Sequence, residues 1–144
     1  MSEVARSALV SFSAQQMYDL VNDVNRYSEF LPGCVSSKVL ESTDKSMLAM
    51  MELKKGPVRQ IFTTSNTMVI GQSIEMELQD GPFKYLHGRW FFRQLTDDAC
   101  KVELDLSFEF SSKLTSAAFS RIFTDLTSRL VDSFVTRAEV VYGN

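Results

Sequence analysis

Apolar and polar residues alternate along this chain with two different periods, and the change between them separates sheet from helix. From Cys34 to Phe110 the period is two, which is the spacing of side chains on one face of a β-strand. The clearest stretch is 102–110, where Val102, Leu104 and every second residue onward are apolar and the residues between are polar. One face is therefore dry and the other wet, which predicts an antiparallel sheet packed on a core.

Turn-forming residues separate the alternating segments at the distances that hairpins need. They include Lys55-Gly56-Pro57 and Asp80-Gly81-Pro82, whose glycine and proline favour tight turns. Because short connections make neighbours in sequence neighbours in the sheet, we expect one meander. A further strand is predicted at residues 3–11, which brings the expected total to about six to seven strands.

Two short helices are predicted after the first strand. Ser13 and Gln16 have the spacing of a capping box, which marks the start of a helix. A second helical turn is expected before Pro32-Gly33, because that pair ends a helix.

A long C-terminal helix is predicted for residues 113–142, with an apolar stripe on one side. Arg121 and Asp125 lie on the opposite side, at the spacing of a helical ion pair. At about 1.5 Å per residue the helix spans on the order of 40 Å, and the dry face of the sheet is the apolar surface available to cover it. We therefore expect a single α+β domain over residues 1–144, with a curved antiparallel sheet around this helix. The stripe consists of Phe119, Phe123, Leu126 and Leu130.

Composition narrows the possible partners and location. The 144 residues carry a net charge of −3, which argues against a general nucleic-acid binder and predicts no DNA partner. Cys34 and Cys100 are isolated, so no disulfide or zinc site is expected. The start does not resemble a signal peptide, and no apolar run is long enough for a membrane helix. A cytoplasmic location is expected, with membrane contact at most transient.

Catalytic chemistry is not indicated. The lone His87 has no carboxylate close to it in sequence to orient it, so we interpret it as a surface residue. The six glycines do not form a phosphate-binding loop, and the outward-facing carboxylates predict no metal site. We expect a binding protein with no catalytic residues and no cofactor.

Seven methionines and eleven phenylalanines are many for this length. Methionine fills irregular space and repacks around varied apolar groups. These residues either fill a core or line a cavity for a hydrophobic ligand. The residues predicted to line such a cavity are Phe30, Leu31, Trp90, Phe108, Phe110, Phe123, Leu126 and Leu130.

Arg137 interrupts the stripe of the long helix, one turn after Ser133. Either it reaches solvent past the sheet edge, or it lies at the polar end of the cavity. We predict the second arrangement, in which Arg137 and Ser133 would hydrogen-bond the polar head of a ligand.

Several motifs together resemble one known family. The order of elements is similar to the START-like helix-grip fold, and the motifs resemble the coenzyme Q-binding, or polyketide cyclase/dehydrase-like, family. The similarity is strongest to bacterial members described as ribosome association toxins. The motifs are Tyr27-Ser-Glu-Phe30-Leu31-Pro32-Gly33-Cys34, Asp80-Gly81-Pro82-Phe83, Leu86-His-Gly88-Arg-Trp90-Phe-Phe92, Phe108-Glu-Phe110 and Val135-Thr-Arg137-Ala138.

The resemblance implies two functions that need not exclude each other, and its cyclase label adds a third hypothesis. The favoured expectation is a carrier for ubiquinone or another isoprenoid quinone, which would support respiration. The alternative is a toxin that binds the large (50S) ribosomal subunit, blocks subunit joining and inhibits translation initiation. For that role the basic hairpin tip offers Lys54, Lys55 and Arg59 as contacts with the ribosome. A polyketide cyclase-like enzyme is the third and least favoured reading.

Overall fold

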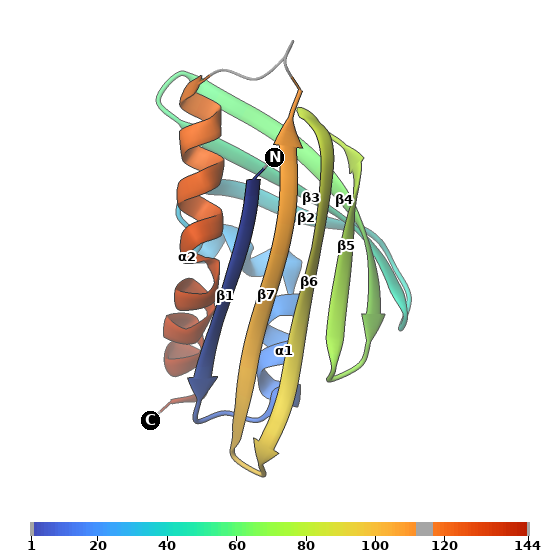
Figure 1. The fold of residues 1–144 in the computed structure, drawn as a ribbon, viewed down its shortest axis with the longest axis vertical. Coiled ribbons are helices and arrows are strands. Elements are labelled where there is room, and N and C mark those ends of the chain that lie inside the picture. Colours follow the sequence, from blue (N-terminus) through green and yellow to red (C-terminus); the bar gives the residue numbers. More distant parts are fainter. Residues whose placement is uncertain (1, 112–116, 144) are drawn as a thin grey trace.

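A computed structural model describes residues 2–111 and 117–143, and within them a curved, seven-stranded antiparallel sheet holds helices on one face (Figure 1). The strands are β1 (Ser2–Val10), β2 (Cys34–Ser42), β3 (Ser46–Lys55), β4 (Val58–Val69), β5 (Ser73–Asp80), β6 (Phe83–Thr96) and β7 (Ala99–Phe110).

The sheet is the predicted meander with one long-range addition. Strands β2 to β7 follow one another in order, and β1 then pairs with the outer side of β7. Ser2 lies opposite Phe108 and Val10 lies opposite Cys100, so β1 covers most of that edge. The antiparallel sheet and its topology confirm the prediction from alternation and turns.

The predicted capping box is also confirmed. The Gln16 backbone N–H donates to Ser13 Oγ at 3.1 Å, and the Ser13 N–H donates to Gln16 Oε1 at 2.9 Å. Two N–H groups that a helix start leaves unpaired are thereby satisfied. Helix α1 (Ala14–Asn22) begins there, and the second short helix, η1 (Val24–Glu29), is a 3₁₀ helix.

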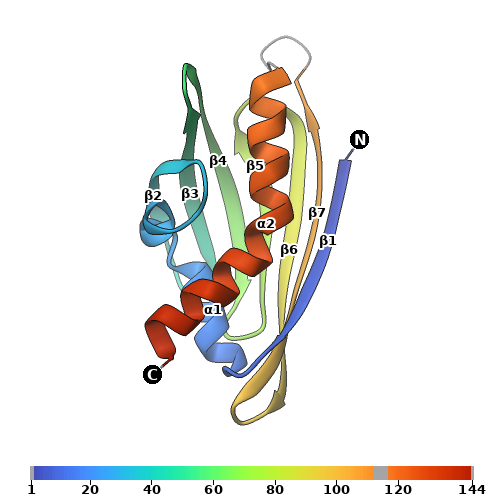
Figure 2. The ribbon, with the colours of Figure 1, turned by 90° about the vertical axis from the view of Figure 1, so that its left-hand side faces the viewer.

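Helix α2 (Ala117–Tyr142) crosses the concave face of the sheet (Figure 2). The predicted start at residue 113 lies outside the described residues. The predicted Arg121–Asp125 pair is wrong, because Asp125 instead forms an ion pair with Arg129 at 3.2 Å. An acidic residue four positions before a basic one is the more favourable orientation on a helix, since it also complements the helix dipole.

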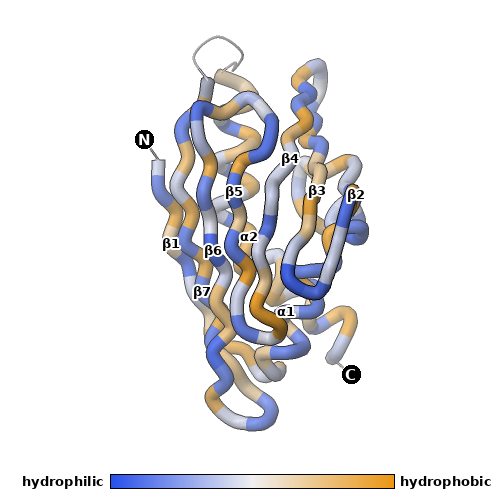
Figure 3. Tube along the Cα trace, turned by 90° about the vertical axis from the view of Figure 1, so that its right-hand side faces the viewer, coloured by the Kyte–Doolittle hydropathy of each residue, from blue (hydrophilic) through white to orange (hydrophobic). Residues whose placement is uncertain are grey.

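Hydrophobic and hydrophilic residues alternate along the strands, as the colours of the trace show (Figure 3). In β7, Val102, Leu104, Leu106 and Phe108 are all buried. Aromatic rings then close one end of the trough under α2. Phe123 packs against Phe83 and Phe108 with ring centroids 4.8 and 4.9 Å apart, within the range in which such pairs stabilise a core.

Candidate ligand cavity and basic groove

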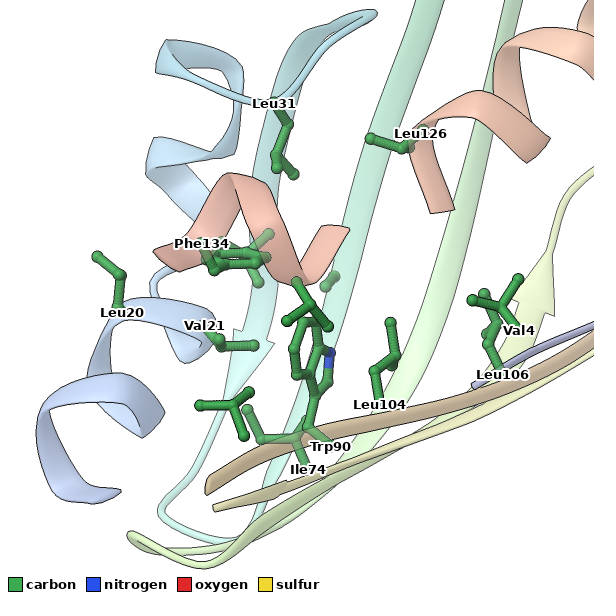
Figure 4. Packing of buried hydrophobic residues seen from close by; sticks show 14 of the residues in the cluster. Val4, Leu20, Val21, Leu31, Ile74, Trp90, Leu104, Leu106, Leu126 and Phe134 are labelled. Carbon is green, nitrogen blue, oxygen red and sulfur yellow. The ribbon is translucent and has the colours of Figure 1, made fainter. Parts of the chain in front are cut away.

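A cavity of about 90 Å³ lies between α2 and the inner face of the sheet. Trp90, Phe123, Leu126 and Leu130, all predicted from sequence, line it together with Phe134. In Figure 4 the Trp90 side chain points from the sheet toward α2, the helix that carries Leu126 and Phe134. The helix stripe and the dry face of the sheet therefore meet as expected, without filling all the space between them.

Other residues predicted for the cavity lie elsewhere. Phe108 and Phe110 pack in the aromatic cluster around Phe123, with Phe110 5.4 Å from Phe83 between ring centroids. Leu31 is buried in the core without lining the cavity. Phe108 and Phe110 instead pack against each other and against Phe123 at one end of the trough.

Arg137 and Ser133 do not reach the cavity. They line a separate surface hollow with Phe30. The Arg137 Nη2 group donates to Glu29 Oε1 at 2.6 Å, and its guanidinium lies 5.0 Å from the centroid of the Phe30 ring. The predicted position at the polar end of the cavity is thus replaced by an ion pair between α2 and η1.

The cause is a shift in the buried face of α2. In its second half the buried residues are Val131, Phe134 and Ala138, each one position beyond Leu130, Ser133 and Arg137. This half packs against the short helices as well as the sheet. Phe134 lies 5.4 Å from Tyr27 between ring centroids, and the Tyr142 hydroxyl donates to Gln16 O at 2.9 Å. The apolar partners therefore lie on a different side of the helix.

Sequence reasoning missed three polar residues of the cavity lining: Thr64 and Asn66 of β4 and Thr127 of α2. The two strand residues alternate in step with Phe62 and Met68, which are buried on the dry face. A polar residue at a position where the alternation predicts a buried apolar one could therefore have been recognised from the sequence.

The volume of the cavity limits what fits without movement. An engineered cavity of about 150 Å³ holds benzene, and pockets for drug-sized ligands take about 300–1,000 Å³. A 90 Å³ space is smaller than either. Met50, Met51 and Met76 line it, and unbranched methionine side chains are well suited to repacking around an entering group.

His87 has an acidic partner, Glu77, that was not predicted because it lies ten positions away in the sequence. It lies opposite Glu77 in the β5–β6 ladder, and its Nδ1 is 2.5 Å from Glu77 Oε1. Donor atoms of Glu75, Glu77 and His87 lie within 4.8 Å of one another, but Glu75 also pairs with Arg89 at 2.9 Å. We interpret the cluster as an ion-paired patch on the outer face of the sheet, rather than as a metal site.

A basic groove of about 860 Å³ lies between the β3–β4 hairpin and the first half of α2. The charged residues of the described ranges that line it are Lys54, Lys55, Arg121, Arg129 and one carboxylate, that of Asp125. Arg59 on the same hairpin forms an ion pair with Glu52. The predicted basic tip is therefore part of a wider positive surface, to which α2 contributes two further cations.

A curved sheet that wraps a long helix, with a cavity between them, defines the START-like helix-grip fold. The START superfamily protein from Mycobacterium smegmatis has the same fold, with a TM-score of 0.78 over 96% of this chain and 98% of that one at 17% identity. The chain belongs to the polyketide cyclase/dehydrase and lipid transport family, whose model matches residues 10–135.

Two curated relatives represent different branches of this resemblance. Ribosome association toxin RatA from Vibrio cholerae is 57% identical over 99% of both chains. The mitochondrial coenzyme Q-binding protein COQ10 homolog B from Xenopus laevis is 31% identical over 98% of this chain and 59% of that one. In the described part of the chain, no helix is both long and apolar enough to span a membrane.

Proposed function

We propose that this protein is a ribosome association toxin that binds the large ribosomal subunit in the cytoplasm and blocks subunit joining. The observation that carries the proposal is the 57% identity to RatA, which extends over 99% of both chains. The proposed role is non-catalytic, because it requires binding alone. It reverses the order of the two leading functions expected from sequence, since the quinone-binding relative is only 31% identical.

The basic groove is the surface we propose for contact with rRNA. Among the described residues, four cations and one carboxylate line it, although the whole chain carries a net charge of −3. Local field rather than net charge governs the approach of a phosphate backbone. Lys54 and Lys55 are exposed and have no ion-pair partner among the described residues, whereas Arg59 is held by Glu52 and contributes less.

Charge reversal in the groove tests the proposal. We expect Lys54→Glu, Lys55→Glu and Arg121→Glu together to weaken co-sedimentation with purified large subunits at least tenfold. The matched control reverses Arg6, Lys38 and Lys45, which are exposed, lie outside the groove and change the net charge equally. Equal losses in both triple variants would show that net charge alone matters. Unchanged sedimentation of both variants would exclude the groove as the contact.

A second function, binding of a hydrophobic ligand such as an isoprenoid quinone, is favoured by the apolar cavity between α2 and the sheet. Trp90 is the sole tryptophan and lines this cavity, so its fluorescence reports directly on an entering ligand. Saturating short-chain quinone should change that emission and raise the thermal midpoint, because a ligand that binds only the folded state stabilises it. If neither quantity changes, the cavity does not bind quinone.

A further inference from the structure

The cavity brings together polar side chains that the rest of the described core lacks. Thr64, Asn66 and Thr127 are 8%, 5% and 2% exposed, and other threonine, asparagine and charged side chains of the described residues are less deeply buried. All three line the one cavity. Asparagine is normally depleted from β-strands, so Asn66 is an unusual residue at a core-facing position of β4. The polar residues are therefore concentrated where a ligand would enter.

Asn66 has unused hydrogen-bonding capacity. Its Oδ1 is buried and has no hydrogen-bond partner among the described residues. Thr127, by contrast, donates from Oγ1 to the Thr124 carbonyl at 3.2 Å. An unsatisfied buried polar group costs about 1–3 kcal/mol, so a ligand that hydrogen-bonds to the Asn66 amide would remove that cost.

We propose that Asn66 binds the polar head group of an amphipathic ligand inside the cavity, with Thr64 beside it on the same face of β4. The inference rests on the ligand-binding function proposed above and specifies its orientation. The apolar remainder of the ligand contacts Trp90 and Leu126. The head group therefore lies within the trough, and not at the Arg137 hollow.

The chemistry of the lining defines the class of head group. No acidic or basic side chain of the described residues lines the cavity, and an ionised head would lose its hydration without a partner. Fatty acids and phospholipid phosphates are therefore disfavoured. An amide both donates and accepts hydrogen bonds, so it pairs with a hydroxyl or a carbonyl. Neutral phenols, hydroquinones and quinones fit this description.

Two probes of nearly equal size separate head-group recognition from burial of an apolar ring. 4-Methylphenol carries a hydroxyl where p-xylene carries a methyl group. We expect 4-methylphenol to bind the native protein and to shift the NMR signals of the Asn66 side-chain amide. Asn66→Leu should weaken 4-methylphenol binding about tenfold, while p-xylene binding is unchanged or tighter. Met68→Leu is the control, because Met68 follows Asn66 on the buried face of β4 without lining the cavity.

Each contrary outcome identifies what has failed. If p-xylene binds but 4-methylphenol binds the native protein and Asn66→Leu equally well, the cavity does bind apolar ligands. The proposed role of Asn66 is then overturned. Unperturbed Asn66 amide signals at saturation overturn it as well, without recourse to a variant. If neither probe binds, both this inference and the ligand-binding function fail. Co-sedimentation of Asn66→Leu with large subunits should match the native protein, which keeps the ribosome proposal separate.

Discussion

At the scale of single residues, burial raises the pKa of the Cys34 thiol. Its side chain is buried where η1 gives way to β2, and loss of hydration raises its pKa to about 11 from an ordinary 9.0. Burial raises the pKa of Cys100 as well. Both side chains are free thiols, and the neutral form is the one the fold accommodates.

The raised pKa predicts a pH-dependent stability. The folded state favours the neutral thiol, so the contribution of Cys34 is complete below about pH 9 and is lost as pH rises toward about 11. Cys34→Ala should flatten the dependence of the urea unfolding midpoint on pH between those values. Identical slopes in native protein and variant would contradict the prediction. Alkylation of Cys34 at pH 8 should be roughly a hundredfold slower than for a free thiol, since thiolate is the reactive form.

At the scale of elements, an ion pair joins the second half of α2 to η1. The Arg137 side chain is only 18% exposed, and it contacts both Glu29 and the Phe30 ring. Such a pair fixes the position of a short 3₁₀ helix, which has few hydrogen bonds of its own. Arg137 is thus a structural connection between elements.

Arg137→Leu tests this connection. We expect it to lower the free energy of unfolding by about 1 kcal/mol, the scale of a partly exposed ion pair with a cation–π contact. Binding of quinone or small phenols should not change, because Arg137 does not line the cavity. A double-mutant cycle with Glu29→Gln in urea should give a non-zero coupling energy. Strictly additive effects would mean that the pair does not stabilise the fold.

Local patterns predicted the elements well, and longer-range packing explains the errors. The capping box at Ser13 and the alternation of β7 depend on neighbouring residues, and both are present in the structure. The position of Arg137 depends on α1 and η1, which cover one side of α2. A helical wheel cannot predict those contacts because it uses only the residues of the helix itself. The His87–Glu77 contact depends on the register of β5 against β6. Whether large side chains fill a trough, as Phe108 does, is likewise a property of packing.

At the scale of the whole molecule, the cavity and the basic groove are distinct surfaces, and none of the described residues lines both. The cavity belongs to the inner face of the sheet under α2. The groove lies outside, between the β3–β4 hairpin and the helix. The proposed ligand binding and the proposed ribosome binding should therefore be separable by substitution.

Gly88→Ala should impair ligand binding in the cavity without affecting ribosome binding at the groove. An added Cβ would lie 2.7 Å from Leu106 Cδ1 and 2.8 Å from Met76 Cε, so both of these cavity-lining side chains must move. We expect ligand affinity to fall at least threefold, with co-sedimentation unchanged. The groove triple variant should show the reverse pattern. Parallel losses of both activities in either variant would indicate that the two sites are coupled.

The pairing of β1 with β7 also has a consequence for how the newly made chain folds. Strands β2 to β7 are joined by short hairpins and can pair as they are synthesised, whereas β1 has its partner some ninety residues later. At about 5–20 residues per second, β1 waits roughly 5–20 s for β7. During that interval Val4 and Val10, buried in the finished fold, have no sheet to cover them. The first strand to be synthesised is thus among the last to dock, and the nascent chain is most exposed to aggregation and proteolysis at its beginning.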